Sequence, residues 1–245
     1  ASSVNADRCD IYTDVEGVYS TDPNIEPKAK KISKLSFEEM LEMSSMGAKV
    51  LHTRSVELAM KNNLILQVLS SITKKNGTFI LDEKNMIEKE IVSGVSYSKN
   101  ESKITISGIP DKPGISAQIF GLLADKNINV DMIVQNISQD GILANITFTV
   151  PNLEINSAKE LLKNNKDNIN YQSLISDVNV SKISVIGMGM MSQSGVAKKM
   201  FKTLANNSIN ILAISTSEIK ISVLINEKYT NVAVKSLHEA YNLNQ

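Results

Sequence analysis

The pattern of hydrophobic and polar positions separates a first part of mixed elements from a second part of repeated ones. In the first part, alternating or continuous apolar residues predict strands, and apolar residues at helical spacing predict helices. The predicted elements are a strand at 9–15, a helix from 36, a helix at 51–60 and a strand at 65–69. Residues 71–90 carry weaker periodicity and are interpreted as a connector.

The helix from residue 36 has a recognisable start. Ser36 followed three residues later by Glu39 is the signature of a capping box, in which each residue bonds the backbone of the other. Phe37 and Met40 then begin an apolar face. Glu38, Glu39 and Glu42 occupy the other positions of the helix and are interpreted as solvated.

Two copies of one pattern occupy the second part of the chain. A glycine, a second glycine, and then Phe, Leu-Ala and Asn recur at residues 108–129 and 187–210, with Gly114 and Gly195 81 positions apart. Each copy predicts a strand, a turn, an amphipathic helix and two strands, and a last helix is predicted at 230–241. The predicted core stripes are Ile115, Ile119 and Leu123 in the first copy and Val196, Met200 and Leu204 in the second. Such a repeat indicates a duplicated fold whose copies pair and form sites where they meet.

Length, charge and cysteine content exclude several classes of protein. The 245 residues allow one or two domains, and 26 basic residues balance 26 acidic ones, so no overall field would attract nucleic acid or an anionic membrane. A single cysteine, Cys9, excludes an intrachain disulfide, and no apolar run reaches the roughly 20 residues that span a bilayer. We therefore expect a cytoplasmic protein with no nucleic-acid or membrane partner. The two histidines, His52 and His238, are far apart in the sequence and predict no metal site, and no catalytic role is assigned to them.

Several segments of the chain carry motifs of one known enzyme family, aside from the repeat itself. The turn Asp111-Lys112-Pro113-Gly114 with its helix, and residues 129–136, resemble the first regulatory ACT domain of that family, and residues 215–223 resemble the second. Residues 12–23 and 47–52 are similar to the nucleotide-side motifs of its kinase domain. The family that the chain resembles is that of the aspartate kinases.

The resemblance covers nearly the whole chain and implies a mixed fold, α/β and α+β. The implied fold consists of the C-terminal part of an amino-acid-kinase α/β domain and two ferredoxin-like ACT domains of βαββαβ order. The expected limits are 1–70 for the kinase part, 71–90 for the connector, 91–180 for the first ACT domain and 181–245 for the second.

The resemblance also implies a reaction. Aspartate kinases transfer a phosphoryl group from ATP, with Mg²⁺, to L-aspartate, the first step toward lysine, threonine and methionine. The ACT pair would bind L-lysine, L-threonine or both as feedback effectors. The family's lysine-glycine-glycine start and its Gly-Gly-Ser-Asp segment have no counterpart here, so we expect an incomplete kinase part, no catalytic residue and no activity from this chain alone.

An alternative is a non-catalytic regulatory subunit or an amino-acid sensor that binds lysine or threonine. The sequence favours association in either case, as a homodimer through the ACT domains or as a heteromer with a catalytic chain, because each copy alone would leave a sheet edge uncovered.

Five residues are the nucleotide contacts that the resemblance implies. At the end of the first strand, Thr13 and Asp14 can offer a hydroxyl and a carboxylate to a nucleoside, and Tyr19 can lend a flat face to a base. Lys49 can neutralise phosphate charge that grows during transfer, and Asp22 completes the set. On local chemistry alone, Thr13, Asp14 and Asp22 are also explained as turn residues.

Effector-binding residues follow from the resemblance in both copies. One effector position would take Asp111, Gly114, Ser116 and Gln135 from the first copy with Asn210 and Ile211 from the second. Ser138, Ala197 and Ser217 would lie near a second effector position. Asp111 can pair with an α-ammonium group, and amide N–H groups at a loop-to-helix start suit a carboxylate. Without the repeat, the 111–114 segment is equally explained as a turn that caps a helix. The sequence leaves open which amino acid is the effector, and whether the strand at 91–97 belongs to the copy nearest in sequence.

Overall fold

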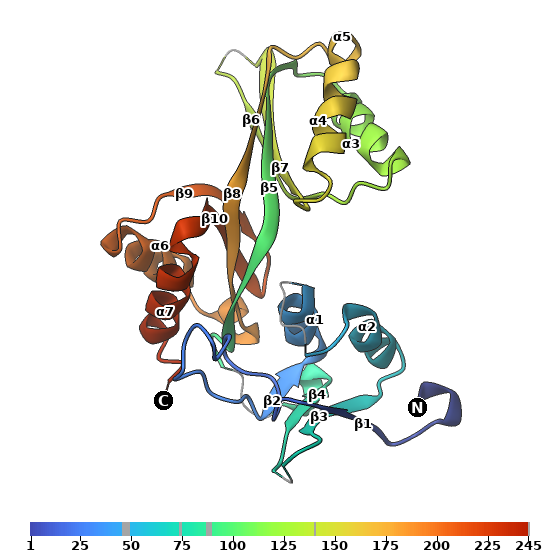
Figure 1. Ribbon diagram of the computed structural model, residues 1–245, viewed down its shortest axis with the longest axis vertical. Coiled ribbons are helices and arrows are strands. Elements are labelled where there is room, and N and C mark those ends of the chain that lie inside the picture. The colour runs from blue at the N-terminus through green and yellow to red at the C-terminus, as the bar shows by residue number, and fades with distance from the viewer. Residues whose placement is uncertain (46–49, 74, 87–89, 140, 245) are drawn as a thin grey trace.

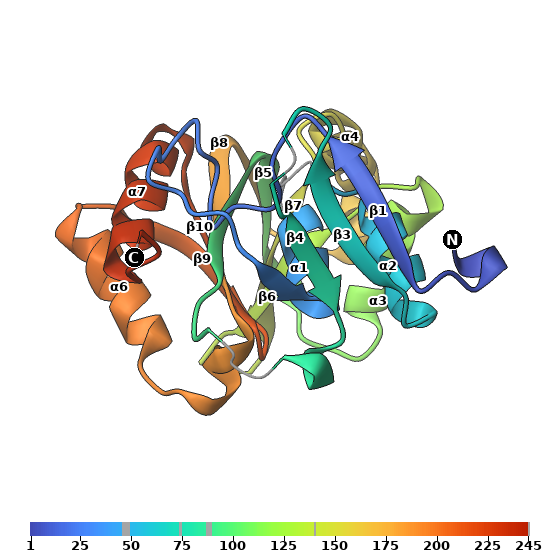
Figure 2. The same ribbon diagram turned by 90° about the horizontal axis from the view of Figure 1, so that it is seen from below.

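The computed structural model describes residues 1–45, 50–73, 75–86, 90–139 and 141–244. Its strands form two sheets, one of four strands in the order β1-β3-β4-β2 and one of six in the order β6-β7-β5-β8-β10-β9. The six-stranded sheet stands along the long axis of the molecule, and the small sheet lies beneath its lower end (Figure 1). Seen from below, the small sheet is nearest the viewer and helices α1 and α2 lie behind it (Figure 2).

The first part of the chain folds as a small α/β unit. Its elements are β1 (Arg8–Thr13), β2 (Lys34–Ser36), α1 (Phe37–Ser45), α2 (Thr53–Lys61), β3 (Ile65–Ser70) and β4 (Thr78–Leu81). The two predicted strands and two predicted helices are confirmed. The capping box is present as well, because Ser36 N–H donates to Glu39 Oε2 at 3.0 Å and Glu39 N–H donates to Ser36 Oγ at 3.1 Å.

Two interpretations of this part were wrong. Glu39 is 1% exposed rather than solvated, Glu38 is half-buried, and Glu42 is half-buried and paired with Lys220. Segment 71–90, interpreted as a connector, contributes β4, which pairs antiparallel with β3 and parallel with β2. A run of four residues is too short for its period to distinguish strand from loop, so the neighbouring strands decide its structure.

The second part contains the two copies. Its elements are β5 (Gly94–Pro110), α3 (Ile115–Asp125), β6 (Asp131–Ile137), β7 (Leu143–Val150), α4 (Ile155–Asn164), α5 (Lys166–Ile169), β8 (Ser173–Ile186), α6 (Val196–Asn206), β9 (Ile211–Thr216), β10 (Lys220–Asn226) and α7 (Thr230–Ala240). The predicted strand, helix and two strands of each copy are confirmed, as is the last helix. The apolar pattern did not locate helices α4 and α5, although the βαββαβ order that the resemblance implies includes a second helix in each copy.

Two long strands, β5 and β8, serve both copies. Residues 103–107 of β5 pair with the first half of β8, and residues 94–98 pair with its second half. Because β10 also pairs with the second half of β8, the strand at 94–98 completes the second copy rather than the first. Each copy then has four strands and two main helices. The sequence left open which copy the strand at 91–97 belongs to, and the pairing register answers this question.

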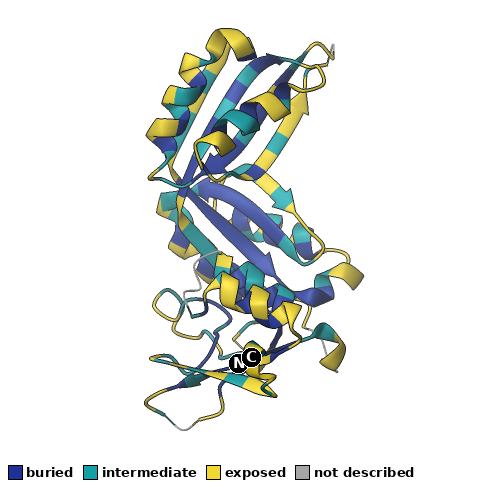
Figure 3. Cartoon of the chain, turned by 90° about the vertical axis from the view of Figure 1, so that its right-hand side faces the viewer, coloured by how far each residue is buried: buried dark blue, intermediate teal, exposed yellow. Residues whose placement is uncertain are grey.

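Each copy has its own hydrophobic core. Helices α3 and α4 cover the first copy and α6 and α7 the second (Figure 1). Both predicted stripes are buried, with Ile119, Leu123, Met200 and Leu204 at 0% exposure. Figure 3 shows buried residues along the strands and exposed residues on the outer faces of the helices. In the part of the chain that the structure describes, no helix is both long and apolar enough to cross a bilayer.

Candidate functional site

The predicted effector residues of the first copy gather at one end of its sheet. Asp111 follows the last residue of β5, and its N–H donates to Ile142 O at 2.9 Å. Gly114 caps α3 with φ of 93°, a left-handed conformation that favours glycine. Ser116 Oγ donates to Gln135 Oε1 at 3.3 Å.

Ser138 lies at the same end, because its Oγ accepts Leu143 N–H at 3.0 Å and Leu143 is the residue after Ile142. Asp111, Gly114 and Gln135 are exposed, and Ser116 and Ser138 are half-buried. The structure therefore brings the five residues of the first copy into one solvent-accessible group at the start of α3.

Asn210, Ile211 and Ser217 of the second copy lie at the two ends of one edge strand. Asn210 and Ile211 stand at the start of β9, and Ser217 follows its end, with Ser217 N–H donating to Lys220 O at 2.8 Å. An extended segment from 211 to 217 spans roughly 20 Å. Ser217 therefore does not lie beside Asn210 and Ile211.

Within one chain the two groups are also apart. The start of β6 meets β9, where Met132 packs with Leu212 and Ala213. Gln135 lies farther along β6, and Ser138 follows the last residue of this strand at its opposite end. The segment from Met132 to Ser138 spans roughly 20 Å. One chain thus places Asn210 and Ile211 near the middle of the molecule and the Asp111 group at its far end.

Two of the predicted nucleotide residues end β1. Thr13 Oγ1 donates to Asp14 Oδ1 at 2.9 Å. Ser71, which follows the parallel strand β3, donates its N–H and its Oγ to Thr13 O at 2.8 and 3.0 Å. The carboxyl ends of β1 and β3 are therefore tied together, and Asp14 lies exposed at this edge.

The other three predicted nucleotide residues have different surroundings. The backbone of Tyr19 pairs with that of Lys31 in an isolated antiparallel β-bridge. Asp22 Oδ1 accepts Asn24 N–H at 2.9 Å, and its Oδ2 accepts the hydroxyl of Tyr97, on β5, at 2.9 Å. Burial, with the bond to Asp22, raises the pKa of Tyr97 to about 12. Asp22 thus contacts the second copy. Lys49 lies outside the described residues.

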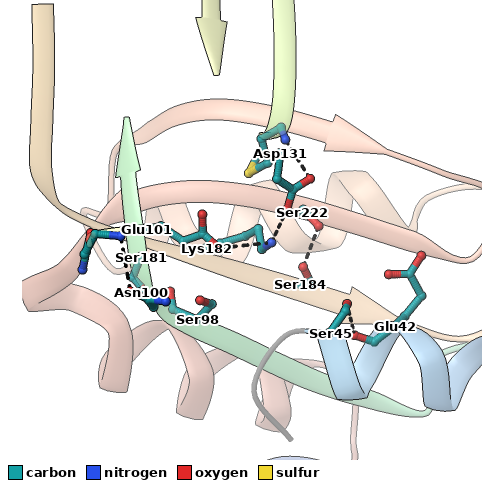
Figure 4. Close-up of polar contacts among 12 residues, drawn as sticks. Glu42, Ser45, Ser98, Asn100, Glu101, Asp131, Ser181, Lys182, Ser184 and Ser222 are labelled. Carbon is teal, nitrogen blue, oxygen red and sulfur yellow. Dashed lines mark hydrogen bonds and ion pairs between the residues drawn. The ribbon is translucent and has the colours of Figure 1, made fainter. Parts of the chain in front are cut away.

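A buried ion-pair cluster joins the two copies where β8 passes from one to the other. Lys182 Nζ lies 3.3 Å from Glu101 Oε1 and also contacts Asp131 Oδ2. Figure 4 shows the lysine side chain reaching from β8 to Asp131 on β6. Burial acts to lower the pKa of Lys182, but the two carboxylates outweigh it and the pKa is raised. Burial acts to raise the pKa of Asp131, but Lys182 brings it below its usual value.

Polar pairs between the first part and the second copy were missed by sequence reasoning. Lys220 Nζ of β10 lies 2.6 Å from Glu42 Oε2 of α1, although the two residues are 178 positions apart. Ser20 Oγ lies 2.9 Å from Nε2 of His238, which is 1% exposed, and burial lowers the pKa of this imidazole. No local pattern links such distant partners, so the sequence offered no signal for them.

Models of two known families match the chain. The model of the amino acid kinase family matches residues 1–70, and ACT domain models match residues 104–166 and 183–241. The aspartokinase of Pseudomonas aeruginosa is 48% identical over 245 residues, which is 99% of this chain and 59% of the relative. The chain thus spans less than two thirds of that relative's length.

Two solved structures are similar to different shares of the chain. The regulatory subunit of aspartate kinase from Thermus thermophilus is 35% identical, with a TM-score of 0.58, over 61% of this chain and 98% of that subunit. E. coli aspartokinase III in complex with lysine and aspartate is 26% identical, with a TM-score of 0.76, over 97% of this chain and 52% of that enzyme. The whole enzyme therefore matches parts of this chain that the regulatory subunit does not.

Proposed function

The chain belongs to the aspartate kinase family, and on this premise we propose that it carries the regulatory part of an enzyme that phosphorylates L-aspartate with ATP. Residues 1–70 are called the kinase segment below, and the two copies are called the first and second ACT units. Binding of an amino acid to the ACT units would favour a less active arrangement of the enzyme. Such control requires that the effector bind the two arrangements with unequal affinity.

The observation that carries this proposal is the bonding of the second ACT unit to the kinase segment. The ion pair between Lys220 and Glu42 reaches α1, and the Tyr97 hydroxyl reaches Asp22. Because these contacts are made by side chains of both parts, a change in the ACT units changes the surroundings of the kinase segment directly. A binding module attached through a flexible linker would lack such contacts.

The group around Asp111 suits a free amino acid. Asp111 is an exposed carboxylate beside the start of α3, so it can pair with an α-ammonium group while the N-terminal amides of the helix receive the α-carboxylate. Ser116 and Gln135 supply further polar atoms next to this position. L-Lysine and L-threonine are the proposed effectors, and lysine is also the ligand named for E. coli aspartokinase III.

A complete site would need a second chain. In the described residues β6 pairs on one side with β7, and β9 pairs on one side with β10. The start of β6 packs against β9, and the rest of each outer edge is available for another strand. Asn210 and Ile211 of a second molecule can reach the Asp111 group through such an edge. We therefore propose a homodimer through the ACT units, or a heteromer with a catalytic chain.

The edge at the ends of β1 and β3 suits the nucleotide. Ligands of open α/β sheets bind beyond the carboxyl ends of the strands, where Thr13 and Asp14 lie. Among the described residues, no group of three or more His, Cys, Asp or Glu side chains could hold a metal ion. In the proposed function Mg²⁺ would arrive with ATP, because this ion is usually bound in part through the phosphates of its nucleotide.

The alternative of a non-catalytic subunit explains less of the chain. The regulatory subunit from Thermus thermophilus matches 61% of this chain, whereas the whole E. coli enzyme matches 97%. A regulatory subunit also leaves unexplained the paired strand ends at Thr13 and Ser71.

Calorimetric titration of the 245-residue chain with L-lysine and L-threonine tests the effector site. Asp111→Ala should weaken saturable binding by about 10- to 100-fold, because it removes a charge-assisted bond. Asp125→Ala is the matched control, since Asp125 is an exposed aspartate on α3 of the same unit. Absence of binding by the unmodified chain, or equal affinity in Asp111→Ala, would contradict the proposed site.

A further inference from the structure

Glu39 is a fully buried carboxylate that serves three segments of the chain. It lies on α1 and is 1% exposed. Its Oε2 accepts the backbone N–H of Ser36 at 3.0 Å. Its Oε1 accepts the hydroxyl of Ser93 at 2.5 Å and the backbone N–H of Met188 at 3.0 Å. Burial of a carboxylate is costly unless it is bonded in this way, so the three donors hold Glu39 in place and are held by it.

Met188, whose N–H is one of these donors, belongs to the loop at residues 187–195. The backbone of this loop packs tightly against residues 90–91. Gly189 N–H donates to Glu90 O at 3.0 Å. A Cβ on Gly187 would lie 2.3 Å from Ile91 O, and one on Gly189 would lie 2.7 Å from Glu90 O. The loop backbone therefore lies directly against residues 90–91, and a shift of either segment moves both donors of Glu39 Oε1.

The two ACT units differ at this point. The equivalent glycine of the first unit, Gly108, lies in β5 shortly before the loop at 111–114, and its N–H donates at 3.1 Å to Asn145 Oδ1, on the same unit's sheet. In the second unit, the N–H of Met188, next to the equivalent Gly187, donates to Glu39 in the kinase segment. The loop that carries the effector residues in the first unit thus has a counterpart that is bonded to a different part of the molecule.

The opposite side of Glu39 controls the start of α1. Its Oε2 satisfies the N–H of Ser36, and its own N–H is satisfied by Ser36 Oγ, so one side chain closes the capping box. Helix α1 ends at Ser45, four residues before Lys49 in the sequence. A displacement at the first turn of a short helix moves the helix as a unit, because its backbone hydrogen bonds make it rigid.

We propose that Glu39 is the positioning residue that transmits the state of the 187–195 loop to α1. When the loop moves, Oε1 loses its donors, and a buried carboxylate cannot remain unbonded. The side chain then shifts, and the capping box at Ser36 opens. That this coupling serves regulation rests on the proposed function. The coupling itself depends only on the hydrogen bonds of Glu39 and can be tested without an effector.

Hydrogen exchange of backbone amides in the 245-residue chain tests the coupling. Glu39→Gln keeps the shape of the side chain but places an amide NH₂ against an N–H or O–H donor. We expect exchange at Met188 to accelerate about tenfold, since one charge-assisted bond is lost. Glu57→Gln, an exposed glutamate on α2, is the matched control and should leave Met188 unchanged. Ser93→Ala is a milder variant that removes one donor and leaves the carboxylate intact.

Transmission is measured by moving the loop. Gly189→Ala forces the loop away from Glu90, and we expect faster exchange in α1. In combination with Glu39→Gln, Gly189→Ala should add little to the exchange of α1, whereas in Ser93→Ala, which keeps the bond between Met188 and Glu39, part of its effect should remain. The inference is overturned if Gly189→Ala leaves α1 unchanged, or if its effect on α1 is as large in combination with Glu39→Gln as alone.

A second arm adds saturating L-lysine or L-threonine. In the unmodified chain we expect the bound amino acid to change exchange in α1, and in Glu39→Gln we expect calorimetric binding without that change. Binding that leaves α1 unaffected, or that affects it equally in Glu39→Gln, also overturns the inference. Failure of both amino acids to bind counts against the proposed effector site, while the Gly189→Ala experiment still decides the role of Glu39.

Discussion

Replacing Lys182 by methionine should destabilise the junction of the two ACT units strongly. The side chains of Lys182 and Glu101 are 7% and 11% exposed, and their charged atoms lie 3.3 Å apart. At an effective dielectric constant of about 20, two unit charges at this distance attract by about 5 kcal/mol, and the burial of both charges offsets much of this. Without the lysine, Glu101 stays buried and uncompensated, which costs about 3–5 kcal/mol. Methionine keeps the length of the side chain, so the loss reports charge rather than volume.

Two further variants separate burial from charge. Asp131 contacts the same ammonium group, but its side chain is 57% exposed, so water replaces the lysine and Asp131→Asn should cost less than about 1 kcal/mol. Combining Lys182→Met with Glu101→Gln removes both buried charges and should recover part of the stability lost in Lys182→Met.

Urea unfolding followed by circular dichroism measures these differences, since the chain contains no tryptophan to serve as a fluorescent probe. Midpoints and slopes are compared for the unmodified chain and the three variants. If Lys182→Met lost no more stability than Asp131→Asn, the reasoning that burial decides the strength of this cluster would be refuted.

Three further predictions concern pH, packing and activity. Burial lowers the pKa of His238 from its ordinary 6.5, so the unfolded chain binds more protons than the folded chain as the pH falls below about 6.5. Thermal stability should therefore fall with the pH in this range, and His238→Gln should remove the dependence. An equal fall in the variant would contradict the assignment. Gly187→Ala should cost more than about 2 kcal/mol in urea unfolding, because its Cβ would lie 2.3 Å from Ile91 O, whereas Gly121→Ala in α3, with no atom within 4 Å, should stabilise by up to about 1 kcal/mol. The 245-residue chain alone, incubated with ATP, Mg²⁺, aspartate and hydroxylamine, should form no aspartyl hydroxamate, and clear formation would refute the expectation of an incomplete kinase part.

Local patterns in the sequence predicted much of the fold. The stripes of α3 and α6 and the capping box at Ser36 follow from spacings of three or four residues. The repeat predicted two similar units, and the resemblance grouped residues that meet in space, such as Ser116 and Gln135. These features could be predicted because a helix period, a cap and a turn each depend on residues that are neighbours in the chain.

Pairing between distant segments could not be predicted. The strand at 94–98 joins the second ACT unit because its register against β8 continues there, although the first unit follows it directly in sequence. Strand β4 exists because β2 and β3 offer it two edges. Asp22 has the appearance of a turn residue in the sequence and is bonded to Tyr97, 75 positions away.

The glutamates of α1 mark the division between what sequence and tertiary structure decide. By itself the sequence determined that a helix follows the cap at Ser36, that each copy forms a strand-helix-strand-strand unit, and that the chain is related to aspartate kinases. It could not distinguish Glu39 from Glu38, since both are charged residues in the first turn of the helix. Only the tertiary structure buries Glu39 against Ser93 and Met188, because burial depends on the free energy of contacts between segments far apart in the chain, which no local pattern records.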